Sequence, residues 1–533
     1  MPRISSTLVS LAALGATVVA GHVGGGVTGP VSGLVHTAEA SDDPALTAAI
    51  DTLLGDPRLD GSQVAVQVRD ARTGEVVYAR DADIRMLPAS NAKLLSSAAA
   101  VDGLGEDFRF ATDVLASGPV SDGKVRSDLY LRGGGDPTTL AADYRALAAD
   151  LRAVGVTKVL GDLVADDSYF DDVPLGTGWS WDDEPYYYSA VTSALTVAPD
   201  TDYDSGTVIV RTSPGASVGS AVAVSTQPAT GALDIVNQAT TGAAGTAKTL
   251  SVERQHASDT VLVTGSVPLG AATDTEWVTV QDPTAYAADV FARALDAEGI
   301  KLLGGVREGT APEGGLVLAS HESMTVGELL TPYMKLSNNM HAEVLVKALG
   351  AETTGSGTWA AGLAAVRSYL TAEGVDAGGT RLVDGSGLSR MNLVRAQDLT
   401  DLLVAVHDEP WFNTWYDALP IAGNPDRFTG GTLRSRMRNT AAANNLHGKT
   451  GSLTGVTALS GYVTNADGRE LVFSMISNNY LTSPRSLEDA LGVTLASWSE
   501  SGDETARQPG ARELRRSTDY GPEGVECSWV KAC

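Results

Sequence analysis

Two periodicities of apolar residues run along the chain and divide it into predicted helices and strands. Apolar residues three and four apart predict helices at residues 41–60, 90–101, 143–153, 286–298, 324–336, 341–349, 359–372 and 486–498. Alternating or β-branched runs predict strands at residues 63–68, 76–79, 128–132, 207–211, 456–463 and 471–476. Helices and strands are both frequent, so the predicted fold class is α/β (α+β).

The order of these elements predicts one layered domain that is interrupted by an insertion. Turn residues at 70–74 and 465–468 join the first and the last strand pair into hairpins. Between residues 109 and 280, short β-type runs alternate with segments rich in Gly, Asp and Ser, without a fixed-period repeat. We therefore expect an antiparallel sheet flanked by helices from residues 41–108 and 281–505, with one or two mostly β domains inserted at 109–280.

Length and charge restrict the classes of function. The chain has 533 residues, of which 43% are hydrophobic, with a mean hydropathy of −0.01 and a net charge of −27. This length exceeds the ~250–300 residues that one core usually reaches, so two or three domains are expected. The negative charge repels phosphate backbones and anionic lipid, which disfavours nucleic-acid binding and membrane docking.

The N-terminal residues have the pattern of an export signal. Arg3 supplies a positive charge, and the apolar run of 8–20 is shorter than the ~20 residues of a membrane span. Ala38-Glu39-Ala40 matches a cleavage site, so residues 1–40 are predicted to be a signal peptide, with a cut near Ala20 as the alternative. We expect a secreted or wall-associated protein without integral membrane contact after signal removal.

Cysteine and histidine usage gives no sign of a metal site. Cys527 and Cys533, the only cysteines, lie in the tail 506–533, and oxidising surroundings would join them in a small disulfide loop. No histidine lies near them, and the seven histidines show no metal-ligand spacing. We therefore expect no metal and no cofactor.

The pattern Ser-x-x-Lys occurs three times, at Ser90/Lys93, Ser121/Lys124 and Ser528/Lys531. Residues three apart share a helix face, which would place the Lys93 amine within reach of the Ser90 hydroxyl. A helix N-terminus also directs backbone N–H groups to where an oxyanion would form. The other two pairs fall in a turn and in the expected disulfide loop. Ser90 is therefore the predicted nucleophile; the alternative is a helix-cap serine with a solvated lysine.

Two more motifs follow along the chain. Lys449-Thr450-Gly451, the only Lys-Thr-Gly, precedes Ser452 and the last strand pair. A cation and a hydroxyl on a strand edge suit a substrate carboxylate, and Gly451 leaves room for close approach to the backbone. Ser337-Asn338-Asn339 lies between two predicted helices and is favoured over Ser477-Asn478-Asn479, which ends a predicted strand.

Along the chain the order is Ser-x-x-Lys at Ser90, Ser-x-Asn at Ser337 and Lys-Thr-Gly at Lys449. In this order, the three motifs resemble the penicillin-interacting serine enzymes. The chain is most similar to low-molecular-mass penicillin-binding proteins of the D-alanyl-D-alanine carboxypeptidase/endopeptidase type (peptidase family S13), including the actinomycete members. The similarity is carried by Lys335–Asn339, Asp384–Arg390, Gly448–Leu453 and Ser460–Tyr462. It implies a penicillin-binding/β-lactamase-like transpeptidase fold, action on peptidoglycan stem peptides and acylation by β-lactam antibiotics.

The resemblance also implies a role for each residue of the first two motifs. Ser90 would be the nucleophile that forms an acyl-enzyme. Lys93 would be its general base. Ser337 and Asn339 would relay a proton to the leaving amine and hold the amide of the acyl peptide.

The third motif is implied to bind the end of the substrate. Lys449 and Thr450 would hold the C-terminal carboxylate, beside Gly451. The backbone N–H groups of Ser90 and Ser452 would form the oxyanion hole. Hydrolysis of the acyl-enzyme by water would complete the carboxypeptidase reaction.

Related enzymes read the side chain of the substrate with a segment of the inserted domain and the Gly-Leu-Ser-Arg run. The residues that match here are Asp183, Tyr188, Leu388, Arg390 and Leu453. Aromatic packing and surface charge pairing are the alternative interpretation of these residues. No role is assigned to His447, because a lysine base makes it redundant.

Two other functions remain open at this point. A β-lactamase shares the fold and the motifs, but no Glu is assigned by the sequence as its deacylation base. A non-hydrolysing sensor of penicillin or wall peptide could have lost part of the proton relay, whereas all three motifs are present here.

Overall fold

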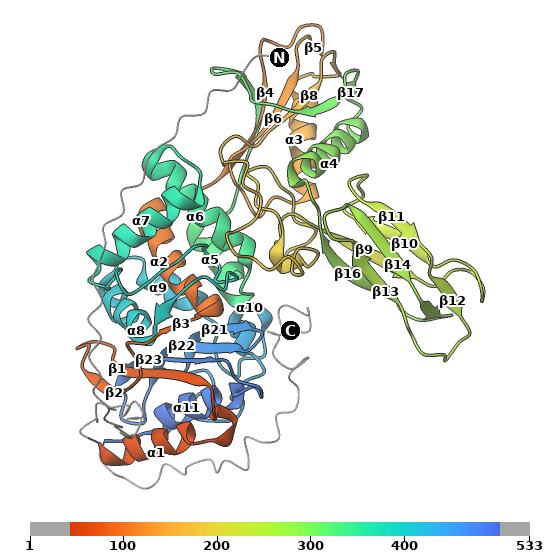
Figure 1. The fold of residues 1–533 in the computed structure, drawn as a ribbon. Helices are drawn as coiled ribbons and strands as arrows, with labels where there is room; N and C mark the ends of the chain where they lie inside the picture. Colours follow the sequence, from red (N-terminus) through yellow and green to blue (C-terminus); the bar gives the residue numbers. More distant parts are fainter. Residues whose placement is uncertain (1–42, 501–533) are drawn as a thin grey trace, which may run out of the picture. The chain divides into compact units, whose positions relative to one another are not determined.

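The computed structural model describes residues 43–500, and its main sheet joins the two ends of this range (Figure 1). The strand order is β2 (Val76–Arg80), β1 (Gln63–Asp70), β23 (Glu470–Asn478), β22 (Val456–Thr464) and β21 (His447–Leu453), with every neighbour antiparallel. Both predicted hairpins are present, and β1 of the first pairs with β23 of the last. The predicted signal peptide and disulfide loop lie outside the described residues.

Helices cover both faces of this sheet (Figure 1). On one face, α1 (Pro44–Leu54) and α11 (Arg485–Ser497) pack on a core that includes Val68 and Phe473. On the other, α2 (Ala92–Leu104) and α8 (Ala396–Ala405) pack on a core that includes Ala65 and Ile476. Successive strand side chains point to opposite faces, so strands that are apolar at nearly every position are buried on both sides.

The remaining helices of this region are α5 (Val326–Lys335), α6 (Asn339–Thr354), α7 (Trp359–Ala372), α9 (Phe412–Ala418) and α10 (Arg427–Gly430). Of these, α5, α6 and α7 pack against α2, while α9 and α10 pack against α5. Helix α5 begins in a capping box formed by Thr325 and Glu328, and α6 ends at Gly355, whose φ of 72° terminates the helix. No helix between residues 43 and 500 is long and apolar enough to cross a bilayer.

The part of the chain that follows α2 and precedes α5 forms a second five-stranded sheet. Its strand order is β18 (Val306–Glu308), β8 (Leu163–Asp166), β6 (Leu129–Gly133), β4 (Ala111–Ala116) and β19 (Leu316–Glu322). Helices α3 (Ala141–Ala153) and α4 (Pro283–Ala297) contribute to its core. The predicted insertion ended at residue 280, whereas strand pairing continues this sheet to Glu322.

Short strands make up most of the rest of the insertion. They are β5 (Lys124–Val125), β7 (Lys158–Val159), β9 (Thr207–Ser213), β10 (Ala223–Gln227), β11 (Asp234–Asn237), β12 (Thr240–Gly242), β13 (Ser251–Arg254), β14 (Thr260–Thr264), β15 (Ser266–Pro268), β16 (Asp274–Thr279) and β17 (Lys301–Leu302). The remaining elements of residues 43–500 are two short strands, β3 (Arg85–Met86) and β20 (Val394–Arg395), and five short 3-10 helices. The 3-10 helices are η1 (Pro57–Leu59), η2 (Ala89–Asn91), η3 (Tyr187–Ser189), η4 (Val406–Asp408) and η5 (Gly431–Leu433).

Candidate active site

Ser90 and Lys93 lie at the start of α2. Ser90 is in the short 3-10 turn η2, and Lys93 is in the first turn of α2. Lys93 Nζ donates a hydrogen bond of 3.0 Å to Ser90 Oγ, and the two residues are only 0% and 3% exposed. The sequence predicted one α-helix from Ser90; the structure begins it with a tighter turn, which still brings residues three apart together.

Two more oxygen atoms hold the Lys93 amine. Asn339 Oδ1 accepts a hydrogen bond from Nζ at 2.6 Å, and the backbone carbonyl of Ser386 accepts one at 2.9 Å. Three donated hydrogen bonds are those of an ammonium group. A neutral amine at this position would keep its two N–H donors for Asn339 Oδ1 and the Ser386 carbonyl and direct its lone pair at the Ser90 hydroxyl, which is the arrangement that activates a serine nucleophile.

Ser337 lies in the link between α5 and α6, and Asn339 is the first residue of α6. Ser337 has a φ of 59°, which non-glycine residues adopt rarely and mostly at functional sites. Asn339 donates from Nδ2 to the Tyr188 carbonyl at 2.7 Å while its Oδ1 binds Lys93. Asn339 therefore connects the predicted base to the segment that carries Tyr188.

Lys449, Thr450 and Ser452 lie on the edge strand β21. Lys449 is fully buried, and its Nζ donates to Ser337 Oγ at 2.7 Å. Gly451 packs against the turn of Ser90, because an added Cβ would come within 2.8 Å of the Pro88 carbonyl oxygen. The sequence explained this glycine by the approach of a substrate, whereas in the structure the approaching backbone belongs to the turn before Ser90.

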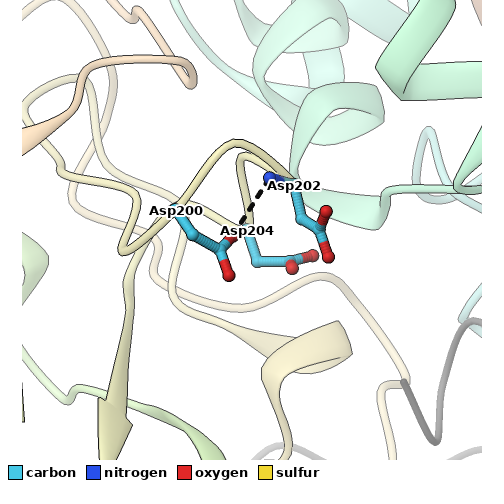
Figure 2. A group of neighbouring side chains, drawn as sticks. All are labelled: Asp200, Asp202 and Asp204. Carbon is cyan, nitrogen blue, oxygen red and sulfur yellow. Dashed lines mark hydrogen bonds between the residues drawn. The ribbon is translucent and has the colours of Figure 1, made fainter. Parts of the chain in front are cut away.

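Three aspartates lie close together in one loop before β9 (Figure 2). Carboxylate oxygens of Asp200, Asp202 and Asp204 lie within 4.8 Å of one another, and the Asp202 N–H donates to Asp200 Oδ1 at 3.0 Å. Such oxygens are typical Ca²⁺ or Mg²⁺ ligands, but Asp202 forms an ion pair with Arg427, and Asp204 accepts from Asn338 Nδ2 at 3.2 Å. The Asp204 contact holds the loop against Asn338 of the second motif, and the ion pair attaches the loop to Arg427.

The apolar residues of the predicted side-chain pocket lie beside the nucleophile. Leu388 and Leu453 are buried in one cluster with Ala89, the residue before Ser90, and Tyr188 packs against this cluster. The structure thus brings together residues from the insertion, from a loop after α7 and from β21.

The charged residues of the predicted pocket are close to this cluster. Tyr188 donates from its hydroxyl to Asp183 Oδ1 at 2.9 Å. Burial raises the pKa of Asp183, while the Tyr188 hydrogen bond and the positive charge of Arg390 oppose this rise. Arg390 is exposed and donates to the Thr454 carbonyl. Asp183 therefore lies beside the Tyr188 hydroxyl and is stabilised in its charged form by Arg390.

The motif copies that were set aside have other places in the fold. Ser121 is exposed in a turn, where its backbone exchanges two hydrogen bonds of 3.0 Å with Lys124. Asn478, at the end of β23, accepts from the Leu87 N–H at 2.8 Å and donates to the Leu87 carbonyl at 3.1 Å. Asn478 thus holds the segment that leads to Ser90. The pair Ser528/Lys531 lies outside the described residues.

His447 stacks on Tyr416, with ring centroids 4.3 Å apart, and its Nδ1 is buried without a hydrogen-bond partner. Burial and the nearby Lys335 ammonium lower the pKa of His447 to about 4. His447 is therefore a neutral, packed imidazole, and no catalytic role is assigned to it.

Three contacts of the site had no signal in the sequence. The Ser386 carbonyl binds Lys93, Thr432 Oγ1 accepts from Thr450 at 2.8 Å, and Arg485 donates to Ser452 Oγ at 3.0 Å. A backbone carbonyl has no residue signature, and Thr432 and Arg485 lie in no recognisable motif. Only tertiary packing brings them to the site.

The chain is similar to known proteins over most of its length. The family model described as the D-Ala-D-Ala carboxypeptidase 3 (S13) family matches residues 46–497. A D-alanyl-D-alanine carboxypeptidase of Actinomadura sp. (strain R39) is 46% identical over 489 residues, which cover 91% of this chain and 89% of that protein. The crystal structure of penicillin binding protein 4 from Haemophilus influenzae superposes with a TM-score of 0.73 at 27% identity, covering 84% of this chain and 98% of that one. The same protein complexed with a β-lactam matches with a TM-score of 0.67 at 25% identity, over 84% and 98% of the two chains.

Proposed function

The chain belongs to the D-Ala-D-Ala carboxypeptidase 3 (S13) family and is a serine-type D-alanyl-D-alanine carboxypeptidase with the penicillin-binding fold, and we propose that it acts outside the cytoplasm on peptidoglycan stem peptides. The proposed reaction passes through an acyl-enzyme on Ser90. The observation that carries the proposal is the 3.0 Å hydrogen bond from Lys93 Nζ to Ser90 Oγ. The predicted signal peptide at residues 1–40 supports the site of action.

In the proposed acylation, neutral Lys93 takes the proton of Ser90 as Oγ attacks the carbonyl carbon of the penultimate D-alanine. The C–N bond then breaks, and the amine of the terminal D-alanine leaves with a proton that reaches it through Ser337. The hydrogen bond from Lys449 Nζ to Ser337 Oγ orients this hydroxyl for the proton transfer. Asn339 is suited to hold both Lys93 and the acyl peptide. Its Oδ1 binds Lys93, and its Nδ2, which donates one N–H to the Tyr188 carbonyl, carries a second N–H for the amide carbonyl of the peptide.

Residues of β21 are proposed to bind the end of the substrate. Lys449 and Thr450 bind the terminal carboxylate, and the backbone N–H groups of Ser90 and Ser452 stabilise the oxyanion. The tight packing of Gly451 against the Ser90 turn supports this arrangement, since it keeps the two N–H groups on neighbouring backbones. Water then hydrolyses the ester, which frees Ser90.

The same geometry supports acylation of Ser90 by β-lactams, whose strained amide presents a carbonyl and a carboxylate in a similar arrangement. A β-lactamase or a non-hydrolysing sensor was the alternative. Identity of 46% to a D-alanyl-D-alanine carboxypeptidase and the intact contacts among the three motifs favour the carboxypeptidase.

Release of D-alanine from a pentapeptide that ends in D-alanyl-D-alanine tests the proposal. The wild type is expected to release it, and Lys93→Ala is expected to release none even at saturating substrate, because the base is lost and not the binding site. Near-wild-type turnover of Lys93→Ala would contradict the assignment of the base.

A further inference from the structure

The turn Asp384–Ser389 contacts Lys93 and the backbone of Ala89, the residue before Ser90. Its Ser386 carbonyl accepts the 2.9 Å hydrogen bond from Lys93 Nζ. Gly387 has a φ of 85°, and an added Cβ would come within 1.9 Å of the Ala89 carbonyl oxygen, next to Ser90. The placement of this turn therefore fixes where the Lys93 amine lies.

Glu343 on α6 holds the turn from one side. Its Oε2 accepts from the Gly385 N–H and its Oε1 from the Ser386 N–H, each at 2.9 Å. A third donor, Trp359 Nε1, lies 2.7 Å from Oε2. Since Asn339 begins the same helix and also binds Lys93, α6 positions the amine twice: directly through Asn339, and through the turn by way of Glu343.

Asp384 closes the turn from within. Its Oδ1 accepts from the Gly387 N–H at 2.9 Å, and its Oδ2 accepts from the Ser389 N–H at 2.7 Å. Trp179 and Asn392 donate to the same carboxylate at 2.9 and 2.7 Å. The turn thus has a fixed shape before Glu343 attaches it to α6.

Two neighbouring buried carboxylates are unfavourable unless they are fully hydrogen-bonded. Glu343 and Asp384 are both 0% exposed. Burial and the charge of Asp384 raise the pKa of Glu343 to about 7, although its N–H donors favour the charged form. A glutamine would relieve this repulsion, but it offers one acceptor oxygen where two successive N–H groups require two.

We infer that Glu343 is a positioning residue for the reaction: its carboxylate holds the Ser386 carbonyl where that carbonyl orients the Lys93 amine toward Ser90. The inference rests on the proposed role of Lys93 as the base. It gives a role in the chemistry to a residue that belongs to none of the three motifs and contacts no reacting atom.

The test compares Glu343→Gln with Trp359→Phe. The first variant places an amide N–H₂ against the Ser386 or Gly385 N–H, whereas the second removes a donor to the same carboxylate and leaves both turn contacts. The measurement is the first-order rate constant of penicillin acylation at saturating penicillin, per titrated active site. Loss of stability alone lowers the number of titratable sites but not this rate constant. Thermal unfolding of both variants shows whether they fold.

Glu343→Gln is expected to acylate about tenfold to a hundredfold more slowly, because small displacements of a catalytic group cost this much. Trp359→Phe is expected to stay close to the wild type. If Glu343→Gln does not fold, Glu343→Asp takes its place. Its side chain is one methylene shorter and no longer reaches both N–H groups of the turn, so it is also expected to slow acylation. A variant at residue 343 that matches the wild type, or an equal loss in Trp359→Phe, would overturn the inference. A wild type that penicillin does not acylate at all would instead contradict the proposed function.

Discussion

Lys449 donates a hydrogen bond of 2.7 Å from Nζ to Ser337 Oγ, although the two residues are 112 positions apart in the sequence. Lys449 lies on β21, and Ser337 lies in the link between α5 and α6. Both are buried, which strengthens the hydrogen bond relative to one in water. The strand proposed to bind the substrate carboxylate and the hydroxyl proposed to pass a proton are therefore one structural unit.

This contact predicts that the effects of Lys449→Ala and Ser337→Ala on kcat/KM are not additive. Removal of Lys449 leaves Ser337 without the donor that orients it, so the loss of Ser337 should matter less in that background. We expect a double-mutant cycle on D-alanine release to give an interaction of about 0.5–3 kcal/mol, typical of residues in contact. Strict additivity would mean that the two residues act independently.

The sequence was most informative where periodicity and turn residues coincide. The helices α5, α6, α7 and α11 and the hairpin of β22 and β23 lie within a few residues of their predicted ranges. The pairing of β1 with β23 could not be derived, because it joins strands about 400 residues apart and neither strand specifies its neighbour. The strands β17, β18 and β19, which follow residue 280, were not predicted either. β17 and β18 have only 2 and 3 residues, and the β19 sequence does not alternate apolar and polar residues.

Prediction of the site followed the same division. Motif residues could be named because their chemistry depends on side-chain type. In the structure Lys93 is hydrogen-bonded to Ser90 and Asn339, and Lys449 is hydrogen-bonded to Ser337. Residues that act through backbone atoms or through second contacts, such as Ser386 and Glu343, could not be named. Glu343 shares its helix with other polar residues such as His341 and Lys347, so the sequence alone does not mark it out.

Asp183 predicts a preference for substrates with a free amine at the end of the side chain before D-alanyl-D-alanine. The carboxylate lies beside Tyr188 and within the field of Arg390, so it can pair with an amine there. We expect the free amine to be cleaved about tenfold to a hundredfold faster than its N-acetylated form, the ratio given by ~1.5–3 kcal/mol for a charged hydrogen bond.

Asp183→Asn is expected to remove most of this preference without changing penicillin acylation, which serves as the control for an intact nucleophile. Equal rates of the two substrates with the wild-type enzyme would show that Asp183 does not read the side chain.

His447 predicts a component of acid sensitivity that is separate from catalysis. Its folded-state pKa of about 4 lies below the ordinary value of 6.5, so the unfolded chain binds the proton more readily at intermediate pH. The stability due to the neutral imidazole is complete above pH 6.5 and is lost as the pH falls toward 4.

His447→Gln should therefore lose less stability than the wild type between pH 6.5 and 4, by about 1–3 kcal/mol. Denaturant unfolding at several pH values measures this difference. D-alanine release by the variant at pH 7 is expected to stay near the wild-type rate, and a large loss of turnover there would reinstate His447 as a catalytic candidate.

The central claim is that Ser90 is the nucleophile, and peptide mapping after reaction with penicillin tests it most directly. The intact mass of the wild type is expected to rise by one penicillin, with the adduct on the peptide that contains Ser90, and Ser90→Ala is expected to gain no mass. Ser121→Ala, which alters the exposed copy of the Ser-x-x-Lys pattern, serves as the matched control and should be labelled like the wild type. An adduct on any other serine, or an adduct that persists in Ser90→Ala, would contradict the account.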